Sequence, residues 1–197
     1  MKKVILTLWL FLPVLLLAYH YGPGQDRLKR DDVSLMLKAA DHYIAKADWE
    51  KAIGLYDQAL FKLPEQEKTL SQQVRLEKAK AQMRFSQLPE ARRDLQILMD
   101  ELMDSPAPDS KIALETRRAL AGSQYYMTWL MRLEGLPEET WKPEIESARQ
   151  NYRLLAEKNP KEGGGASSKM HQEDLESAIR LARMDLGELQ GLPLPSQ

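Results

Sequence analysis

The sequence predicts an all-α protein: a short α-solenoid of about three helix pairs with a C-terminal capping helix, preceded by one N-terminal transmembrane helix. Three observations predict it: an uninterrupted apolar run near the N-terminus, apolar residues that recur every three or four positions from Asp32 onward, and repetition of that pattern along the chain. The 197 residues suffice for one domain and an appendage. The 28 Lys and Arg residues against 29 Asp and Glu provide no basic surface for nucleic acid, and the absence of Cys excludes disulfides and thiolate metal sites.

Residues 1–22 are predicted to be a membrane anchor. Lys2 and Lys3 precede residues 4–21, a run of 18 residues without any Asp, Glu, Lys or Arg. As a helix this run is about 27 Å long, close to the hydrocarbon thickness of about 30 Å. Aromatic residues of the anchor are Trp9 within the span and, at its far edge, Tyr19 and Tyr21. Tyrosines suit the headgroup boundary.

A cleaved signal peptide is the alternative for this segment. Neither Ala18 nor Gly22 completes a small-x-small cleavage site, so we favour an uncleaved, single-pass anchor. Lys2 and Lys3 place the N-terminus in the cytoplasm and the C-terminal domain outside it, although basic residues just after the span oppose this orientation. Residues 23–31, which begin Pro-Gly, are predicted to be a linker.

Residues 32–160 are predicted to form helical repeats. Within residues 33–66, small, aromatic and proline residues are separated by 3, 9, 4, 3 and 5 positions: Ala40, Tyr43, Ala52, Tyr56, Ala59 and Pro64. This segment resembles a tetratricopeptide repeat, of the kind found in membrane-anchored bacterial proteins, and departs from that family's pattern at Met36. Ala40 and Ala52 would let two helices approach closely.

A second copy keeps the same separations but lacks the aromatic and the proline: Ala79, Gln82, Ala91, Leu95, Leu98 and Met103. Pro89 suits the first turn of its second helix.

A third copy is split: Gly122, Tyr125, Ala148, Tyr152, Leu155 and Pro160, with a middle separation of 23 instead of 9. We expect the extra residues to extend the first helix through Leu133 and to form a loop that contains Gly135, Pro137, Trp141 and Pro143. Trp141 either packs onto the third pair, which we favour, or serves as an exposed partner contact.

The C-terminal region completes the array. Residues 161–168 are predicted to be a Gly-rich linker, residues 169–191 a capping helix and residues 192–197 a tail. One apolar stripe marks the capping helix: Leu175, Ile179, Ala182, Leu186 and Leu189.

No glycine-rich phosphate loop, H-E-x-x-H or G-x-S-x-G motif occurs. The sequence therefore predicts no catalytic residue, cofactor or metal site. The three histidines are too dispersed to suggest a metal, and His42 and His171 are expected to be ordinary helix residues.

The resemblance implies a function. In tetratricopeptide proteins the inner face of each first helix binds extended peptides or partner helices. Aligned by repeat register, the positions of this face in the present sequence are Leu37, Asp41, Ile44, Gln73, Leu76, Lys80, Arg84, Ala119, Ser123 and Tyr126. Lys80 and Arg84 would receive an acidic ligand or simply be solvated. The expected function is a membrane-tethered, periplasmic scaffold that binds a protein or peptide and has no catalytic activity. The alternative is an exported soluble helical protein with an unrecognised enzymatic activity or a mainly self-associating role.

Overall fold

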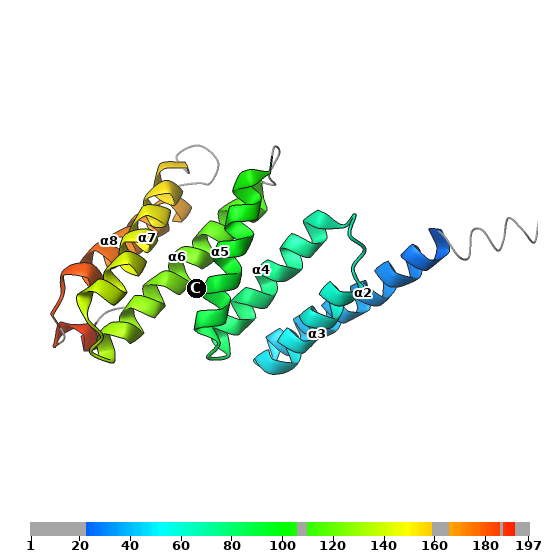
Figure 1. Ribbon diagram of the computed structural model, residues 1–197, viewed down its shortest axis with the longest axis horizontal. Helices are drawn as coiled ribbons and strands as arrows, with labels where there is room; N and C mark the ends of the chain where they lie inside the picture. The colour runs from blue at the N-terminus through cyan, green and yellow to red at the C-terminus, as the bar shows by residue number, and fades with distance from the viewer. Residues whose placement is uncertain (1–22, 106–109, 159–165, 186, 192–197) are drawn as a thin grey trace, which may run out of the picture. The chain divides into compact units, whose positions relative to one another are not determined.

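The computed structural model describes residues 23–105, 110–158, 166–185 and 187–191. These residues contain helices and no strand, so the all-α prediction is confirmed (Figure 1). The elements are α2 (Pro23–Ala45), α3 (Trp49–Lys62), α4 (Lys68–Arg84), α5 (Leu88–Asp104), α6 (Ser110–Leu133), α7 (Glu138–Lys158), α8 (Ala166–Arg183) and a 3-10 turn, η1 (Glu188–Gly191).

The predicted anchor with Trp9, Tyr19 and Tyr21, the predicted tail and most of the predicted Gly-rich linker lie outside the described residues. Among the helices that the structure describes, none has the length and apolar character that a membrane span requires.

The predicted linker at residues 23–31 is wrong, because α2 begins at Pro23. Proline is well tolerated at the first helical position, where its missing N–H would have no intrahelical acceptor. The residues that follow include Gln, Arg, Leu and Lys, which favour helix.

The chain divides into two compact units, one ending at Val74 and the other starting at Arg75. In the first unit, α2 and α3 form a helical hairpin (Figure 1). Ala40, Ala52 and Ala59 are completely buried, and Tyr56 is nearly so. These are the positions at which the repeat pattern places small and aromatic residues, and side chains this small let the two backbones approach closely. At the start of α3 the Asp48 side chain accepts a hydrogen bond from the Lys51 backbone N–H.

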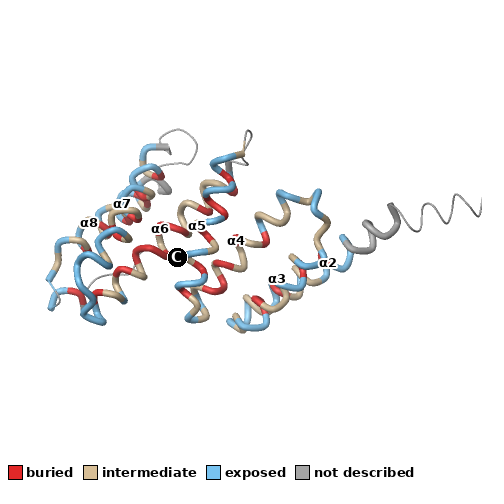
Figure 2. Tube along the Cα trace, in the orientation of Figure 1, coloured by how far each residue is buried: buried red, intermediate tan, exposed pale blue. Residues whose placement is uncertain are grey.

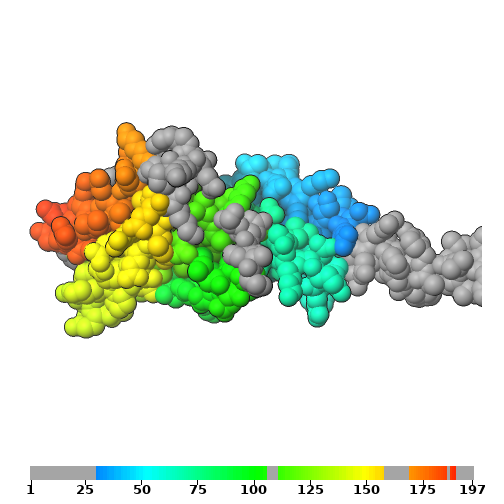
Figure 3. All heavy atoms as spheres, turned by 90° about the horizontal axis from the view of Figure 1, so that it is seen from above, coloured from blue at the N-terminus to red at the C-terminus, as the bar shows by residue number. Residues whose placement is uncertain are grey.

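In the second unit each helix packs against the next one in sequence, and buried residues line the sides that face one another (Figure 2). One core cluster joins the end of α4 to α5 and α6: Leu76, Ala79, Leu95, Leu98, Met99, Leu102, Ile112 and Leu120. A second joins α6, α7, α8 and η1: Ala121, Tyr125, Ile145, Ala148, Tyr152, Leu155, Ala178, Leu181 and Leu189. The close approach of α7 to α8 is visible in the space-filling view (Figure 3).

Helix α6 extends through Leu133, as predicted, but the loop that follows is much shorter than expected. Helix α7 starts at Glu138, so Trp141 and Pro143 are helical and not in a loop. The acidic residues of the first turn of α7 favour this early start because they face the positive end of the helix dipole. Pro143 removes only one hydrogen bond in the second turn, and the helix continues through it.

The capping helix also differs from its prediction. Helix α8 begins before residue 169 and ends at Arg183, and only the short turn η1 follows it. Its buried side is centred on His171, Asp174, Ala178 and Leu181. The predicted stripe runs along one edge of this side, where Leu175 and Ala182 are only partly buried.

Arg132, only 7 % exposed, holds the end of α8 in place. Its guanidinium donates hydrogen bonds to the backbone carbonyls of Leu181 and Met184, which would otherwise lack intrahelical partners. The same group lies 4.7 Å from the centroid of the Trp141 ring. Trp141 packs against the core, which confirms the expectation for its side chain. Three helices therefore meet at one arginine.

We expect Arg132→Ala to lower the free energy of unfolding by about 2–4 kcal/mol, because it leaves two carbonyls without a donor. Arg153→Ala, which removes an exposed arginine of α7 paired only with Glu157, should change it by less than about 0.5 kcal/mol. A double-mutant cycle between Arg132→Ala and Trp141→Ala, followed by circular dichroism in urea, should give a coupling of about 1 kcal/mol. Strict additivity would contradict the stacking interaction.

Two glycines should respond to alanine in opposite directions. Gly54 lies within α3, and a Cβ added there would meet no atom within 4 Å. Gly54→Ala should therefore stabilise the protein by about 0.5–1 kcal/mol. Gly135, in the turn after α6, has φ +72°, so Gly135→Ala should cost about 1–2 kcal/mol. Urea unfolding of both variants measures the difference in sign.

Candidate partner-binding face

The predicted site residues fall in both units. Leu37 and Asp41 of α2 and Gln73 of α4 belong to the first unit, where Leu37 is half-buried and the other two are exposed. Lys80, Arg84, Ser123 and Tyr126 belong to the second unit.

Two of the residues assigned by register are buried. Ser123 is completely buried, and its hydroxyl donates a 2.8 Å hydrogen bond to the Leu120 carbonyl. Leu76 is 1 % exposed and belongs to the core. The prediction that Ser123 contacts a partner is therefore wrong: the side of α6 that carries it is covered by neighbouring helices, and its hydroxyl is satisfied within its own helix.

Lys80 links two helices on this face. Its Nζ lies 2.9 Å from Glu77 Oε1 in α4 and 3.1 Å from Glu115 Oε2 in α6. Partial burial opposes the charged amine, but the hydrogen bonds to Glu77 and Glu115 outweigh it, so the pKa of Lys80 is raised. Lys80 therefore stays protonated, and two carboxylates of its own chain balance its positive charge. Arg84, one turn further along α4, is exposed.

Helix α6 supplies the middle of the face. Glu115, Arg118 and Tyr126 are spaced three and eight residues apart, which puts them on one side of a helix. Arg118 Nη2 lies 3.5 Å from Met170 Sδ of α8. Tyr126 is half-buried, with its ring edge-on to that of Tyr125 at 5.8 Å between centroids.

These contacts define the α4–α6–α8 face, which consists of Lys80, Arg84, Glu115, Arg118, Tyr126 and Met170. It presents charged groups of both signs, one phenol and one thioether. Such a surface can hydrogen-bond and pair with a polar or acidic peptide. Among the described residues no group of three His, Asp or Glu side chains is arranged to hold a metal ion.

A buried polar cluster lies on the core side of α8. His171 and Asp174 are each 3 % exposed, so the interpretation of His171 as an ordinary first-turn residue is wrong. Burial, together with the positive charge of Arg118, lowers the pKa of His171. Burial likewise raises the pKa of Tyr125 to about 12, and the nearby charge of Asp174 adds to this rise. The helical spacing of residues 171, 174, 178 and 181 could have indicated this buried side of α8. Two of these four residues are polar, however, so they do not form an apolar stripe in the sequence.

The lowered pKa of His171 makes stability depend on pH. The unfolded chain binds the proton more tightly than the folded one, so this contribution is complete above about pH 6.5 and is lost as pH falls through the folded pKa. We expect unfolding free energy to fall from pH 7 to pH 5.5 by at most about 1.4 kcal/mol per pH unit. His171→Gln should reduce this slope. Urea titrations at each pH measure the free energy of unfolding of each variant.

Comparison of the chain with protein-family models, curated proteins and solved structures gave no match.

Proposed function

We propose that this chain is a membrane-tethered helical-repeat protein whose α4–α6–α8 face binds a protein or peptide close to the bilayer, with no reaction of its own. Residues 1–22 are its single-pass anchor, and the helical part lies outside the cytoplasm. The helices form a short solenoid of the tetratricopeptide type, with α8 as its cap.

The observation that carries this proposal is the burial of small residues where the repeat pattern requires them. Ala40, Ala52, Ala79, Ala91 and Ala148 are all at most 1 % exposed, and all stand at matched positions of the three copies. Close helix packing at a regular register, repeated along the chain, is the physical basis of a solenoid.

The face itself supports binding more than catalysis. Its side chains are charged or amphipathic and reach solvent, and its ion pairs fix their geometry without burying a titratable group in a cavity. Exposed Arg84, beside the locally neutralised Lys80, is suited to an acidic side chain of a partner. Asp41 and Gln73 remain candidate contacts on the first unit.

The observation that supports the anchor is the apolar run at residues 4–21. Eighteen consecutive residues without a formal charge would be costly in water, and two lysines precede them. Helix α2 begins at Pro23, directly after this segment, so the helical part follows the proposed span without a long tether.

Arg84→Glu should reduce partner binding at least about tenfold if Arg84 faces an acidic group, since loss of a charged contact costs more than about 1.4 kcal/mol. Arg93→Glu, on α5, is the matched control because the Arg93 side chain is 67 % exposed and lies outside the face. Both full-length variants are solubilised in detergent, and the partner recovered with the unchanged chain is quantified by mass spectrometry. Equal recovery with both variants would exclude this face.

Mass spectrometry of the full chain from membranes tests the anchor. We expect an intact N-terminus. A mature N-terminus near residues 19–25 would instead assign a signal peptide and an exported soluble protein. Measurement of the mass of the detergent-solubilised protein separates a self-associating role from binding of a different partner.

A further inference from the structure

Phe61, in the last turn of α3, is 92 % exposed, more than any other large apolar side chain in the described residues. Beside it lies a hollow of about 590 Å³, lined by Asp32, Phe61, Lys62, Leu63, Pro64, Glu65 and Gln66. Phe61, Leu63 and Pro64 thus form one contiguous apolar group at the surface of the first unit, and contiguous exposed apolar groups are where proteins bind partners or membranes.

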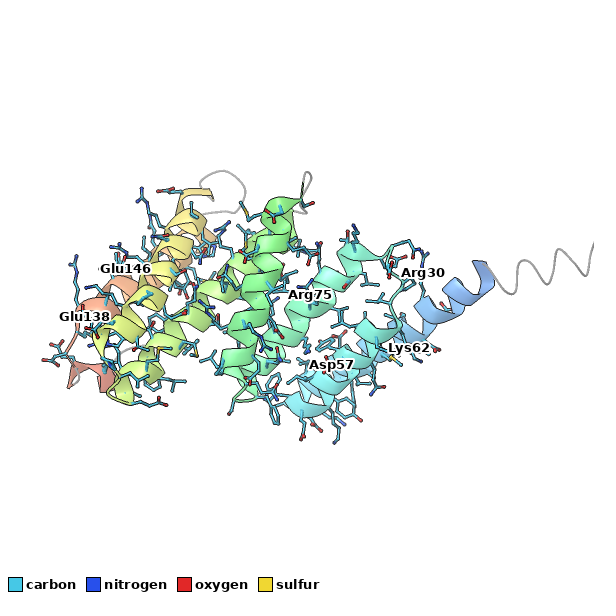
Figure 4. The ribbon with its side chains drawn as sticks, viewed as in Figure 1. Arg30, Asp57, Lys62, Arg75, Glu138 and Glu146 are labelled. Carbon is cyan, nitrogen blue, oxygen red and sulfur yellow. The ribbon has the colours of Figure 1, made fainter. Side chains whose placement is uncertain are left out.

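This hollow lies beside the N-terminal half of α2. Lys62 Nζ is 2.9 Å from Asp32 Oδ2, and Arg30 forms an ion pair with Glu67. Arg30 on α2 and Lys62 at the end of α3 are labelled in Figure 4. Both ion pairs hold the end of α3, and the turn after it, against the N-terminal part of α2. Asp32 is nine residues after Pro23, the first residue of α2, which is about 14 Å along a helix. The proposed anchor would join α2 at Pro23, so the hollow beside Phe61 would lie within about 14 Å of that point along the helix.

The same ion pairs neutralise this end of the unit. Lys62 and Arg30 are each matched by a carboxylate, and the remaining charges near Phe61 include exposed Asp31 and Glu65. Among the described side chains around the hollow, positive charges do not outnumber carboxylates, so they provide no attraction for anionic lipid. The chemistry that fits is apolar contact with an uncharged, zwitterionic surface.

We propose that Phe61, with Leu63 and Pro64, inserts into the headgroup boundary of the bilayer as a second attachment beside the N-terminal anchor. This proposal rests on the proposed anchor. One aromatic side chain binds a membrane weakly by itself, but the anchor makes the encounter intramolecular and raises its effective concentration. Two attachments would fix the orientation of the first unit relative to the membrane.

The contact sets the inclination of α2. If α2 stood upright, Asp32 would lie about 14 Å beyond the hydrocarbon, outside a headgroup layer of about 6 Å. Phe61 reaches the boundary only when α2 lies inclined to the membrane. The opposite end of the α2–α3 hairpin, which carries Glu50, then lies further from the bilayer, because eleven residues of α3 span about 16 Å.

The absence of native Cys allows a direct test. Phe61→Cys and, as the matched control, Glu50→Cys are labelled with an environment-sensitive fluorophore in the full chain, reconstituted in phosphatidylcholine vesicles. We expect spin-labelled lipid to quench the probe at position 61 at least twofold more than the probe at position 50. Equal quenching at the two positions, with circular dichroism unchanged, would overturn the proposal.

Two further readouts separate the possible failures. Extraction of the chain by alkaline carbonate would defeat the anchor, whereas a retained chain with an unquenched probe at position 61 would defeat only the second attachment. Protection of that probe from aqueous iodide without quenching by lipid would assign the hollow to a protein partner or a second copy, and would also overturn the proposal. The unlabelled variant Phe61→Trp should keep the lipid contact. Brominated lipid should then quench its tryptophan fluorescence more than it quenches that of the unchanged chain.

Discussion

No helix that the structure describes can bury its apolar side alone, and this constraint explains most of the structure. Each helix has an apolar side and a polar side, so each one needs another helix packed against it. Alanines at the contacts permit close approach, while Tyr56, Tyr125 and Tyr152 fill the wider spaces. Loss of one helix would therefore expose the apolar side of the helix packed against it.

Helix α8 has an unusual buried side. His171 and Asp174 occupy half of its four central positions, where leucine would bury more apolar surface. Polar burial weakens the hydrophobic contribution of α8, so its position depends more on specific contacts. Arg132 supplies two hydrogen bonds to its C-terminal end and stacks on Trp141. A chain of side-chain hydrogen bonds also joins α6 to α7: buried Gln124 donates to Ser147 Oγ and accepts from the Asn151 amide. These contacts fix the relative rotation of three helices more tightly than apolar packing alone.

The sequence predicts the positions of the helices well wherever the spacing of small and aromatic residues is regular. It predicts the pairing of α2 with α3, Pro89 at the start of α5 and the end of α6 at Leu133. Its errors have local physical causes. Proline and glycine at residues 22–24 suggested a break, yet proline at a first helical position favours a start. Trp141 and Pro143 suggested a loop, but acidic residues just before them favour a helix. Ser123 was assigned to the surface because register gives the side of a helix and not what covers it. The buried role of His171 depends on packing between distant segments, which no local pattern contains.

The two candidate contacts of this protein differ in the free energy that each makes available. The α4–α6–α8 face is polar, and its ion pairs already satisfy much of its charge, so a partner there must compete with contacts such as Lys80 to Glu115. Binding on that face is then expected to be selective and modest in affinity, since each new pair replaces an old one. At Phe61 no existing contact of the ring has to be replaced, because the ring is exposed and binding there only displaces water. If the proposed anchor holds the chain at a membrane, the polar face of the second unit would determine which partner binds, and the apolar end would determine the inclination of the first unit.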